Sequence, residues 1–187
     1  MQNRGNDIGH NLTAYTDALK RLVIDKPDMS VTESANRSLL LVSFRPFTNI
    51  PDRGNILKYL AKQDPHFHHE MDISHAEWLR QISNHKFVLA PFGHGLDTHR
   101  LSEILMMGGI PVTRRSTISS CFDDTDNNFN GLSRGSLPIL ILDSWANLTK
   151  QTLDSEWERI SKLPTATFDY KRVFLNHWLE RIDKITT

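Results

Sequence analysis

Hydrophobic residues follow two patterns along this chain: short continuous runs, and stripes that repeat every three or four residues. A continuous run predicts a strand buried on both faces, because such a strand has no solvent-facing side to carry alternating polar residues. Runs of this kind occupy residues 39–44, 87–90, 110–113 and 137–142. Each is a candidate core strand of a parallel sheet.

The stripes predict helices between and after these runs. They cover about 51–60, 74–84, 154–163 and 168–185, with a further helix that carries Leu101, Ile104 and Leu105 and stops at Gly108 and Gly109. The helix at 74–84 has the clearest start: Ser74 and Glu77 have the spacing of a capping box. Ile73 and Trp78 have the spacing of the hydrophobic staple that accompanies it.

Strands and helices in alternation predict an α/β fold, a Rossmann-like doubly wound parallel sheet with helices on both faces. The length of 187 residues suits one domain. We assign residues 38–187 to this domain and residues 1–37 to a lead-in segment with one possible helix at 13–24. The polar loop at 114–135 is long enough to be functional or mobile.

Composition removes several classes of function. Basic and acidic residues balance at 22 each and the hydrophobic fraction is 39%, so we expect neither a disordered chain nor a nucleic-acid partner. Cys121 is the only cysteine, which leaves no intrachain disulfide and no cysteine-rich zinc site. The apolar runs are too short to cross a bilayer, so we expect no membrane segment and no signal peptide.

A glycine loop offers the strongest candidate chemistry. Gly93, His94 and Gly95 follow the run at 87–90 and precede a helix, the position where open α/β sheets bind anions. Arg100 and Glu103 lie one turn apart on that helix, so the guanidinium could reach a diphosphate while the carboxylate accepts from a ribose diol. The alternative is a surface salt bridge between the two side chains.

Other polar and aromatic residues have simpler interpretations. His94 and His99 are expected to be solvated, because no neighbouring carboxylate marks either as a base. A zinc site at His66, His68 and His69 is disfavoured, because no nearby cysteine completes a ligand set. The tryptophans with helical spacing are expected in the core; they are Trp145, Trp157 and Trp178.

Two stretches around the glycine loop are KFVLAPFGHGLDTHRLSE at 86–103 and GGIPV at 108–112. In the order and spacing of their residues, they resemble the donor-site core of exostosin-like glycosyltransferases. The resemblance extends upstream to VSF at 42–44 with Thr48, Asn49 and Arg53, and downstream to LPILILDSW at 137–145. It implies that residues 38–149 belong to the C-terminal lobe of a GT-B fold, which binds a nucleoside-diphosphate sugar, typically a UDP-sugar, without metal or other cofactor.

The resemblance also implies roles for single residues. Gly93, Gly95 and Arg100 match phosphate-contacting positions, and Glu103 matches the acid that binds ribose. Arg114 and Arg115 stand in the next loop at the ligand edge of the sheet, Arg53 is a further phosphate candidate, and His94 stands where the family often has Asn. Ser102 and Gly109 replace the Trp and Cys common there, which leaves the sugar open.

Partners and location follow from the same resemblance. A glycan or glycoconjugate acceptor and the general base belong to the family's N-terminal lobe, of which this chain has no recognisable part. Members of the family are often associated with Golgi or secretory membranes. Two functions therefore stay open: the donor lobe of a glycosyltransferase, and a module that binds a nucleotide or nucleotide sugar without catalysis.

Overall fold

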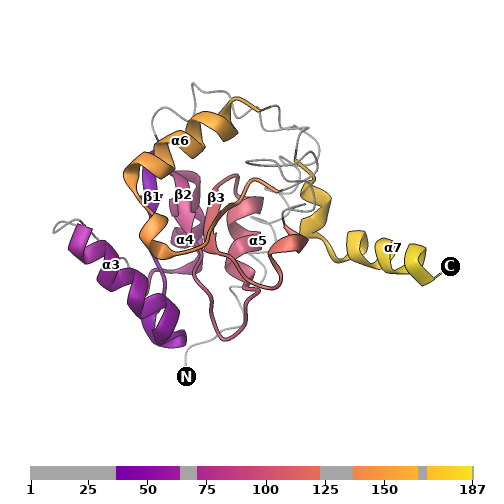
Figure 1. Ribbon diagram of the computed structural model, residues 1–187, viewed down its shortest axis with the longest axis horizontal. Helices are drawn as coiled ribbons and strands as arrows, with labels where there is room; N and C mark the ends of the chain where they lie inside the picture. Colours follow the sequence, from indigo (N-terminus) through magenta and orange to yellow (C-terminus); the bar gives the residue numbers. More distant parts are fainter. Residues whose placement is uncertain (1–36, 64–70, 123–136, 164–167, 187) are drawn as a thin grey trace.

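A computed structural model describes residues 37–63, 71–122, 137–163 and 168–186 of the chain (Figure 1). Four parallel strands form one sheet in the order β1-β2-β3-β4. They are β1 (Ser38–Leu41), β2 (His85–Leu89), β3 (Ile110–Arg114) and β4 (Leu140–Leu142). Helices flank this sheet, so the predicted α/β class and parallel sheet are confirmed.

Several sequence-based expectations fall outside the described residues. They are the lead-in at 1–37 except its last residue, its possible helix at 13–24, the histidines at 66, 68 and 69, and most of the loop at 114–135. Within the described part, no helix has the length and apolar character needed to cross a bilayer.

The outer strands are shorter than the hydrophobic runs that predicted them. β1 ends at Leu41, although Val42, Ser43 and Phe44 are also buried. The carbonyl of Ser43 accepts a hydrogen bond from Arg100 Nη1 at 2.6 Å, so a side chain from another element already occupies this acceptor. The buried segment that the hydrophobic run predicted therefore continues past the last residue of the strand.

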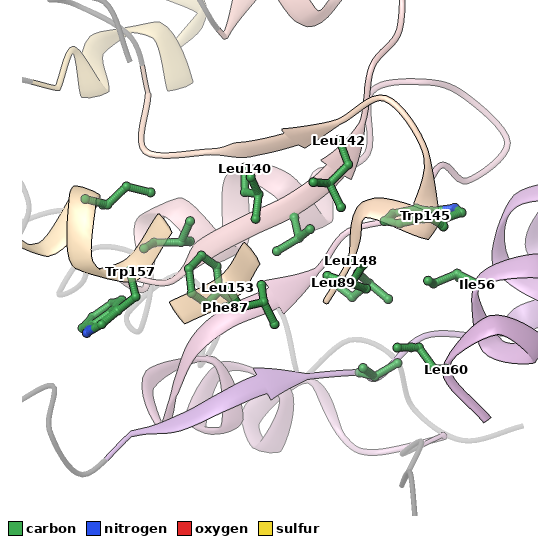
Figure 2. Packing of buried hydrophobic residues seen from close by; sticks show 14 of the residues in the cluster. Ile56, Leu60, Phe87, Leu89, Leu140, Leu142, Trp145, Leu148, Leu153 and Trp157 are labelled. Carbon is green, nitrogen blue, oxygen red and sulfur yellow. The ribbon is translucent and has the colours of Figure 1, made fainter. Parts of the chain in front are cut away.

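Side chains of β2 point alternately to two hydrophobic layers, as a strand requires. Phe87 and Leu89 pack on the face covered by α3 (Asn55–Gln63) and α6 (Lys150–Ser161), whose buried residues include Ile56 and Trp157 (Figure 2). Val88 and Ala90 pack on the opposite face. There they meet α4 (His75–Ser83) and α5 (His99–Met106).

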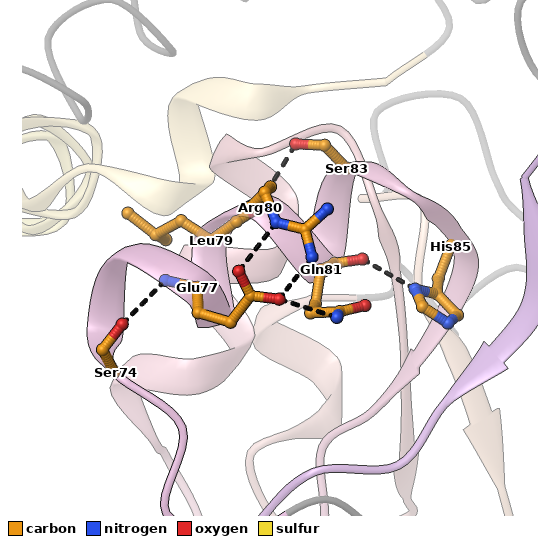
Figure 3. A network of polar contacts seen from close by, with 7 residues as sticks. All are labelled: Ser74, Glu77, Leu79, Arg80, Gln81, Ser83 and His85. Atoms are coloured by element: carbon orange, nitrogen blue, oxygen red, sulfur yellow. Dashed lines mark hydrogen bonds and ion pairs between the residues drawn. The ribbon is translucent and has the colours of Figure 1, made fainter.

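The start of α4 agrees with the sequence in part. Ser74 Oγ accepts from the Glu77 N–H at 3.2 Å, so Ser74 is the N-cap (Figure 3). The Glu77 carboxylate, expected to bond back to Ser74, accepts instead from Arg80 Nε at 2.7 Å and Gln81 Nε2 at 2.8 Å. Ile73 packs against the cluster that contains Trp78, as a staple would.

The end of α5 brings the chain directly into β3. Gly108 adopts a φ of 74°, and the N–H groups of Gly108 and Gly109 donate to Leu105 O and Ile104 O. This is a Schellman motif, which requires a left-handed residue and so favours glycine. A Cβ on Gly109 would lie 3.0 Å from both Ile82 and Ile104, so glycine also allows α4 and α5 to approach each other.

The C-terminal segment differs from the predicted single helix at 168–185. A short 3-10 helix, η6 (Tyr170–Val173), precedes α7 (Leu175–Thr186), which extends away from the rest of the chain in Figure 1. Trp145 and Trp157 are buried as expected. The core assignment of Trp178 was wrong: it is half-buried, and its indole N–H donates to Arg172 O at 2.9 Å.

Two further helices begin at other residues than their hydrophobic stripes predicted: α6 begins earlier and α3 begins later. α6 begins at Lys150 because Thr149 caps it, accepting from the Thr152 N–H at 3.1 Å. α3 begins at Asn55, after a 3-10 turn at Pro46–Thr48 and a π-helical turn at Ile50–Gly54. The latter turn buries Asp52 and Arg53, which both bear on the site.

Candidate functional site

An open pocket of about 610 Å³ lies beyond the carboxyl ends of β1 and β2, between the starts of α4 and α5. This is the position where open α/β sheets bind ligands. Six of the eight predicted site residues line it: Arg53, Gly93, His94, Gly95, Arg100 and Glu103. Arg114 and Arg115 do not line this pocket.

The glycine loop forms one wall of the pocket. Gly93 N–H donates to Gly95 O at 3.1 Å, and Asn49 Nδ2 donates to Gly93 O at 2.9 Å. A Cβ on Gly93 would lie 3.3 Å from both Arg53 Nη2 and Thr98 Cγ2. Glycine is therefore needed here for close approach of the loop to a buried guanidinium, and not for an unusual φ.

Arg53 is buried beneath this loop. Its Nε donates to Phe92 O at 2.8 Å and its Nη1 to Arg45 O at 3.0 Å, while its guanidinium lies over the Phe44 ring. Desolvation lowers the pKa of Arg53, partly opposed by the charge of Asp52. The guanidinium is thus held mainly by neutral carbonyl oxygens.

Arg100 approaches from the first turn of α5. Its Nη1 donates to Ser43 O, and its guanidinium carbon lies 4.0 Å from the centroid of the Trp78 ring. Burial lowers the pKa of Arg100 to about 10; the positive charge of Arg53 adds to this shift and Glu103 opposes it. The group remains a cation at neutral pH, and its contacts are buried ones, unlike the surface salt bridge with Glu103 that the sequence left as the alternative.

Glu103 is only 7% exposed. Its Oε2 accepts from Trp78 Nε1 at 2.8 Å, and its Oε1 lies 3.0 Å from His75 Nε2. The side of α5 that carries Glu103 faces α4, and these two partners make the burial tolerable. The carboxylate nevertheless borders the pocket.

Residues of α4 were not recognised as part of the site from the sequence. Trp78 has the spacing of a core residue, and that spacing says nothing about where its indole N–H points. His75 stands in the first turn of α4, where the sequence drew attention only to the cap. The general rule that a buried carboxylate needs donors could have indicated that Glu103 has partners, but not which ones.

A second polar cluster lies beside the pocket and is centred on Asp52. The buried Asp52 carboxylate accepts from Phe92 N–H and from Trp145 Nε1, each at 2.9 Å. Arg114 Nε is 2.7 Å from Asp52 Oδ1 but does not aim its hydrogen at that oxygen, so the contact is an ion pair. Nearby, Arg115 donates to Asp143 at 2.6 Å on the surface.

Exposed residues close in sequence to the pocket lining are both polar and apolar. His94 and His99 are exposed, as expected. Four exposed hydrophobic side chains lie within two residues, in sequence, of a lining residue: Phe47, Ile50, Met71 and Leu96.

Among the described residues, no group of three or more His, Cys, Asp or Glu side chains is arranged to hold a metal ion. No family model matches the chain, and no curated protein matches it. The likeness to exostosin-like glycosyltransferases therefore rests on the motif residues themselves, and the site must be interpreted from its geometry.

Proposed function

We propose that this pocket binds the nucleoside-diphosphate part of a nucleotide sugar and that the chain is the donor lobe of a metal-independent glycosyltransferase. The observation that carries the proposal is the convergence of Arg53 and Arg100 on the pocket wall beside Gly93. Both cations are desolvated, and the charge of Arg53 lowers the pKa of Arg100. A bound dianion would offset both unfavourable effects.

The surroundings of the two arginines support a diphosphate over a single carboxylate or phosphate. Two guanidiniums offer several N–H donors, and such charge-assisted bonds to phosphate are stronger than neutral ones. The loop at Gly93 and the start of α5 add backbone N–H groups at the same edge of the sheet. A volume of about 610 Å³ suits a ligand larger than inorganic phosphate.

Glu103 supports a nucleoside portion. Its carboxylate borders the pocket, and each carboxylate oxygen can accept more than one hydrogen bond. A ribose diol placed beside the diphosphate would lie within reach of the pocket side of this carboxylate. Assignment of UDP as the nucleotide follows from the family resemblance.

In this proposal the arginines also contribute to catalysis. Sugar transfer leaves negative charge on the departing diphosphate, and preorganised cations at that place stabilise the transition state without a metal ion. The acceptor and the base would come from a second lobe. Phe47, Ile50, Met71 and Leu96 are exposed hydrophobic residues close in sequence to the lining, and such residues would suit a surface that this lobe covers.

Calorimetry with UDP, UMP and uridine tests the proposal. We expect affinity to rise with each phosphate and to be unchanged by a chelator, since Arg53 and Arg100 supply the positive charge. Uridine binding as tightly as UDP, or UDP binding only with magnesium or manganese, would contradict it. Turnover of a UDP-sugar in the presence of an acceptor then separates a transferase from a module that only binds.

A further inference from the structure

Trp78 contacts two of the three side chains assigned to the nucleotide, Glu103 and Arg100. Its indole N–H donates to Glu103 Oε2 at 2.8 Å, and its ring faces the Arg100 guanidinium at 4.0 Å. The two contacts use different parts of one side chain, the N–H edge and the π face. Trp78 itself is only 4% exposed.

We infer that Trp78 is a positioning residue: it fixes the ribose-binding carboxylate of Glu103 and the phosphate-binding guanidinium of Arg100 relative to each other. The inference rests on the proposed function. Glu103 and Arg100 have flexible side chains, and each would lose orientation without a fixed partner. One rigid indole with two distinct contacts fixes both relative to each other.

Trp78 can perform this role because its own position is fixed. It belongs to α4, whose start is capped by Ser74, and it packs in a cluster with Leu79, Ile82 and Val88 beneath the sheet. Each of the two side chains also has another contact: Arg100 Nη1 donates to Ser43 O, and Glu103 Oε1 lies against His75 Nε2. Removing Trp78 therefore takes one fixed contact from each of the two side chains.

Two substitutions separate the contacts. Trp78→Phe keeps an aromatic face for Arg100 and removes the N–H that Glu103 accepts from, whereas Trp78→Leu removes both. Leu79→Ala is the matched control, because Leu79 is the next residue on α4, is equally buried at 4%, and does not line the pocket. If Trp78→Phe does not fold, benzothienylalanine at position 78 keeps the two-ring shape without the N–H.

The measurements are affinities for UDP, 2′,3′-dideoxy-UDP and uridine, together with melting temperatures. Preference for UDP over the dideoxy compound reports ribose recognition, and preference for UDP over uridine reports phosphate recognition. We expect Trp78→Phe to reduce the first preference by about tenfold, the low end for one hydrogen bond to a charged group, and to leave the second within about threefold. Trp78→Leu should reduce both.

The outcomes are distinguishable. Leu79→Ala should lower the melting temperature and leave both preferences unchanged. If Trp78→Phe and Trp78→Leu fold and keep both preferences, the positioning role is overturned. It is also overturned if Leu79→Ala loses the same ligand preferences as the Trp78 variants. Failure of the wild-type chain to bind UDP would instead overturn the proposed function and this inference with it.

Discussion

Two arginine clusters lie side by side at the carboxyl edge of the sheet, and their partners differ. Arg53 and Arg100 donate to backbone carbonyl oxygens and stand in the pocket wall. Arg114 and Arg115 pair with the carboxylates of Asp52 and Asp143. The first cluster keeps net positive charge where a ligand could enter, whereas the second is neutralised.

The comparison shows why an arginine at the ligand edge is not sufficient to predict an anion site. The sequence placed all of these arginines near the same edge, since each follows a strand or the loop after it. What separates them is the nature of the acceptor, because a carbonyl dipole fixes a guanidinium without cancelling its charge. An anion is expected to gain more from the first cluster than from the second.

The largest expected effect is on stability and concerns the neutralised cluster. Asp52→Asn leaves Arg114 without its counter-charge and gives one oxygen to donors that used two, Phe92 N–H and Trp145 Nε1. We expect a loss of about 2–3 kcal/mol in the free energy of unfolding, below the 3–5 of a fully buried pair because Arg114 reaches solvent. Urea unfolding measures it.

The matched control is Asp143→Asn, which breaks the exposed pair with Arg115. Exposed pairs contribute little, so its unfolding free energy should change by less than about 1 kcal/mol. Equal losses in the two variants would show that Asp52 is no more important to the fold than a surface carboxylate.

The next effect is on ligand binding and concerns the charged cluster. Arg100→Ala should weaken UDP binding by roughly 2 kcal/mol or more through loss of charge-assisted contacts, while uridine binding barely changes. Arg115→Ala is the control, and we expect its UDP affinity to equal that of the wild type. Calorimetry on both variants measures these affinities. Equal losses of UDP affinity in Arg100→Ala and Arg115→Ala would show that the two clusters do not differ in anion binding.

The same variant has a smaller and less obvious effect on stability. In the first turn of a helix a cation opposes the helix dipole, so this position alone makes Arg100 slightly unfavourable for folding. The structure adds its stacking on Trp78 and its bond to Ser43 O, whose loss opposes the relief of a buried charge. We therefore expect the unfolding free energy of Arg100→Ala to change by less than about 1 kcal/mol.

Glu103→Gln sharpens the comparison in another way, because this carboxylate is buried and yet borders the pocket. We expect a cost of about 1–3 kcal/mol of stability, because an amide has one acceptor oxygen where the carboxylate presents one to Trp78 Nε1 and the other to His75 Nε2. UDP affinity should fall by about 1.5 kcal/mol. Affinity for 2′,3′-dideoxy-UDP is the control; an equal loss there would exclude a role in ribose recognition.

The sequence predicted the sheet and the glycine loop well, because both depend on local patterns. Continuous apolar runs mark strands covered on two faces, and glycines between a strand and a helix mark the loop at the carboxyl edge of the sheet. It also placed Arg53, Gly93, Arg100 and Glu103 at one edge. It could not show that Glu103 is buried, that Trp78 links it to Arg100, or that Asp52 neutralises Arg114.

Those features depend on contacts between elements far apart in the chain. The bond from Trp78 to Glu103 spans 25 residues, and that from Trp145 to Asp52 spans 93. Trp178 shows the converse: its helical spacing matched that of Trp157, but α7 extends away from the sheet and its Leu175, Leu179 and Ile182 are exposed. Periodicity predicts which face of a helix is apolar and not whether that face is covered.

The smallest expected effect is a dependence of binding on pH. Because burial lowers the pKa of Arg100 to about 10 in the free chain, the side chain loses its proton well below the ordinary range for arginine. A bound diphosphate favours the cation and raises that pKa again. Binding therefore takes up a proton once the pH exceeds about 10, and the contribution of Arg100 to affinity falls as the pH rises further.

The measurement is the ratio of UDP affinities between the wild type and Arg100→Ala, followed from pH 7 to pH 11. Ionisation of UDP itself affects both proteins equally and cancels in this ratio, so the remaining change belongs to Arg100. We expect a constant ratio up to about pH 9 and a decline beyond it, because the cation that distinguishes the two proteins is being lost. Arg115→Ala, whose side chain lies outside the pocket, should follow the wild type throughout. A ratio that stays constant to pH 11 would mean that loss of the Arg100 charge in this range does not affect binding, and would contradict the lowered pKa of Arg100 as a determinant of affinity.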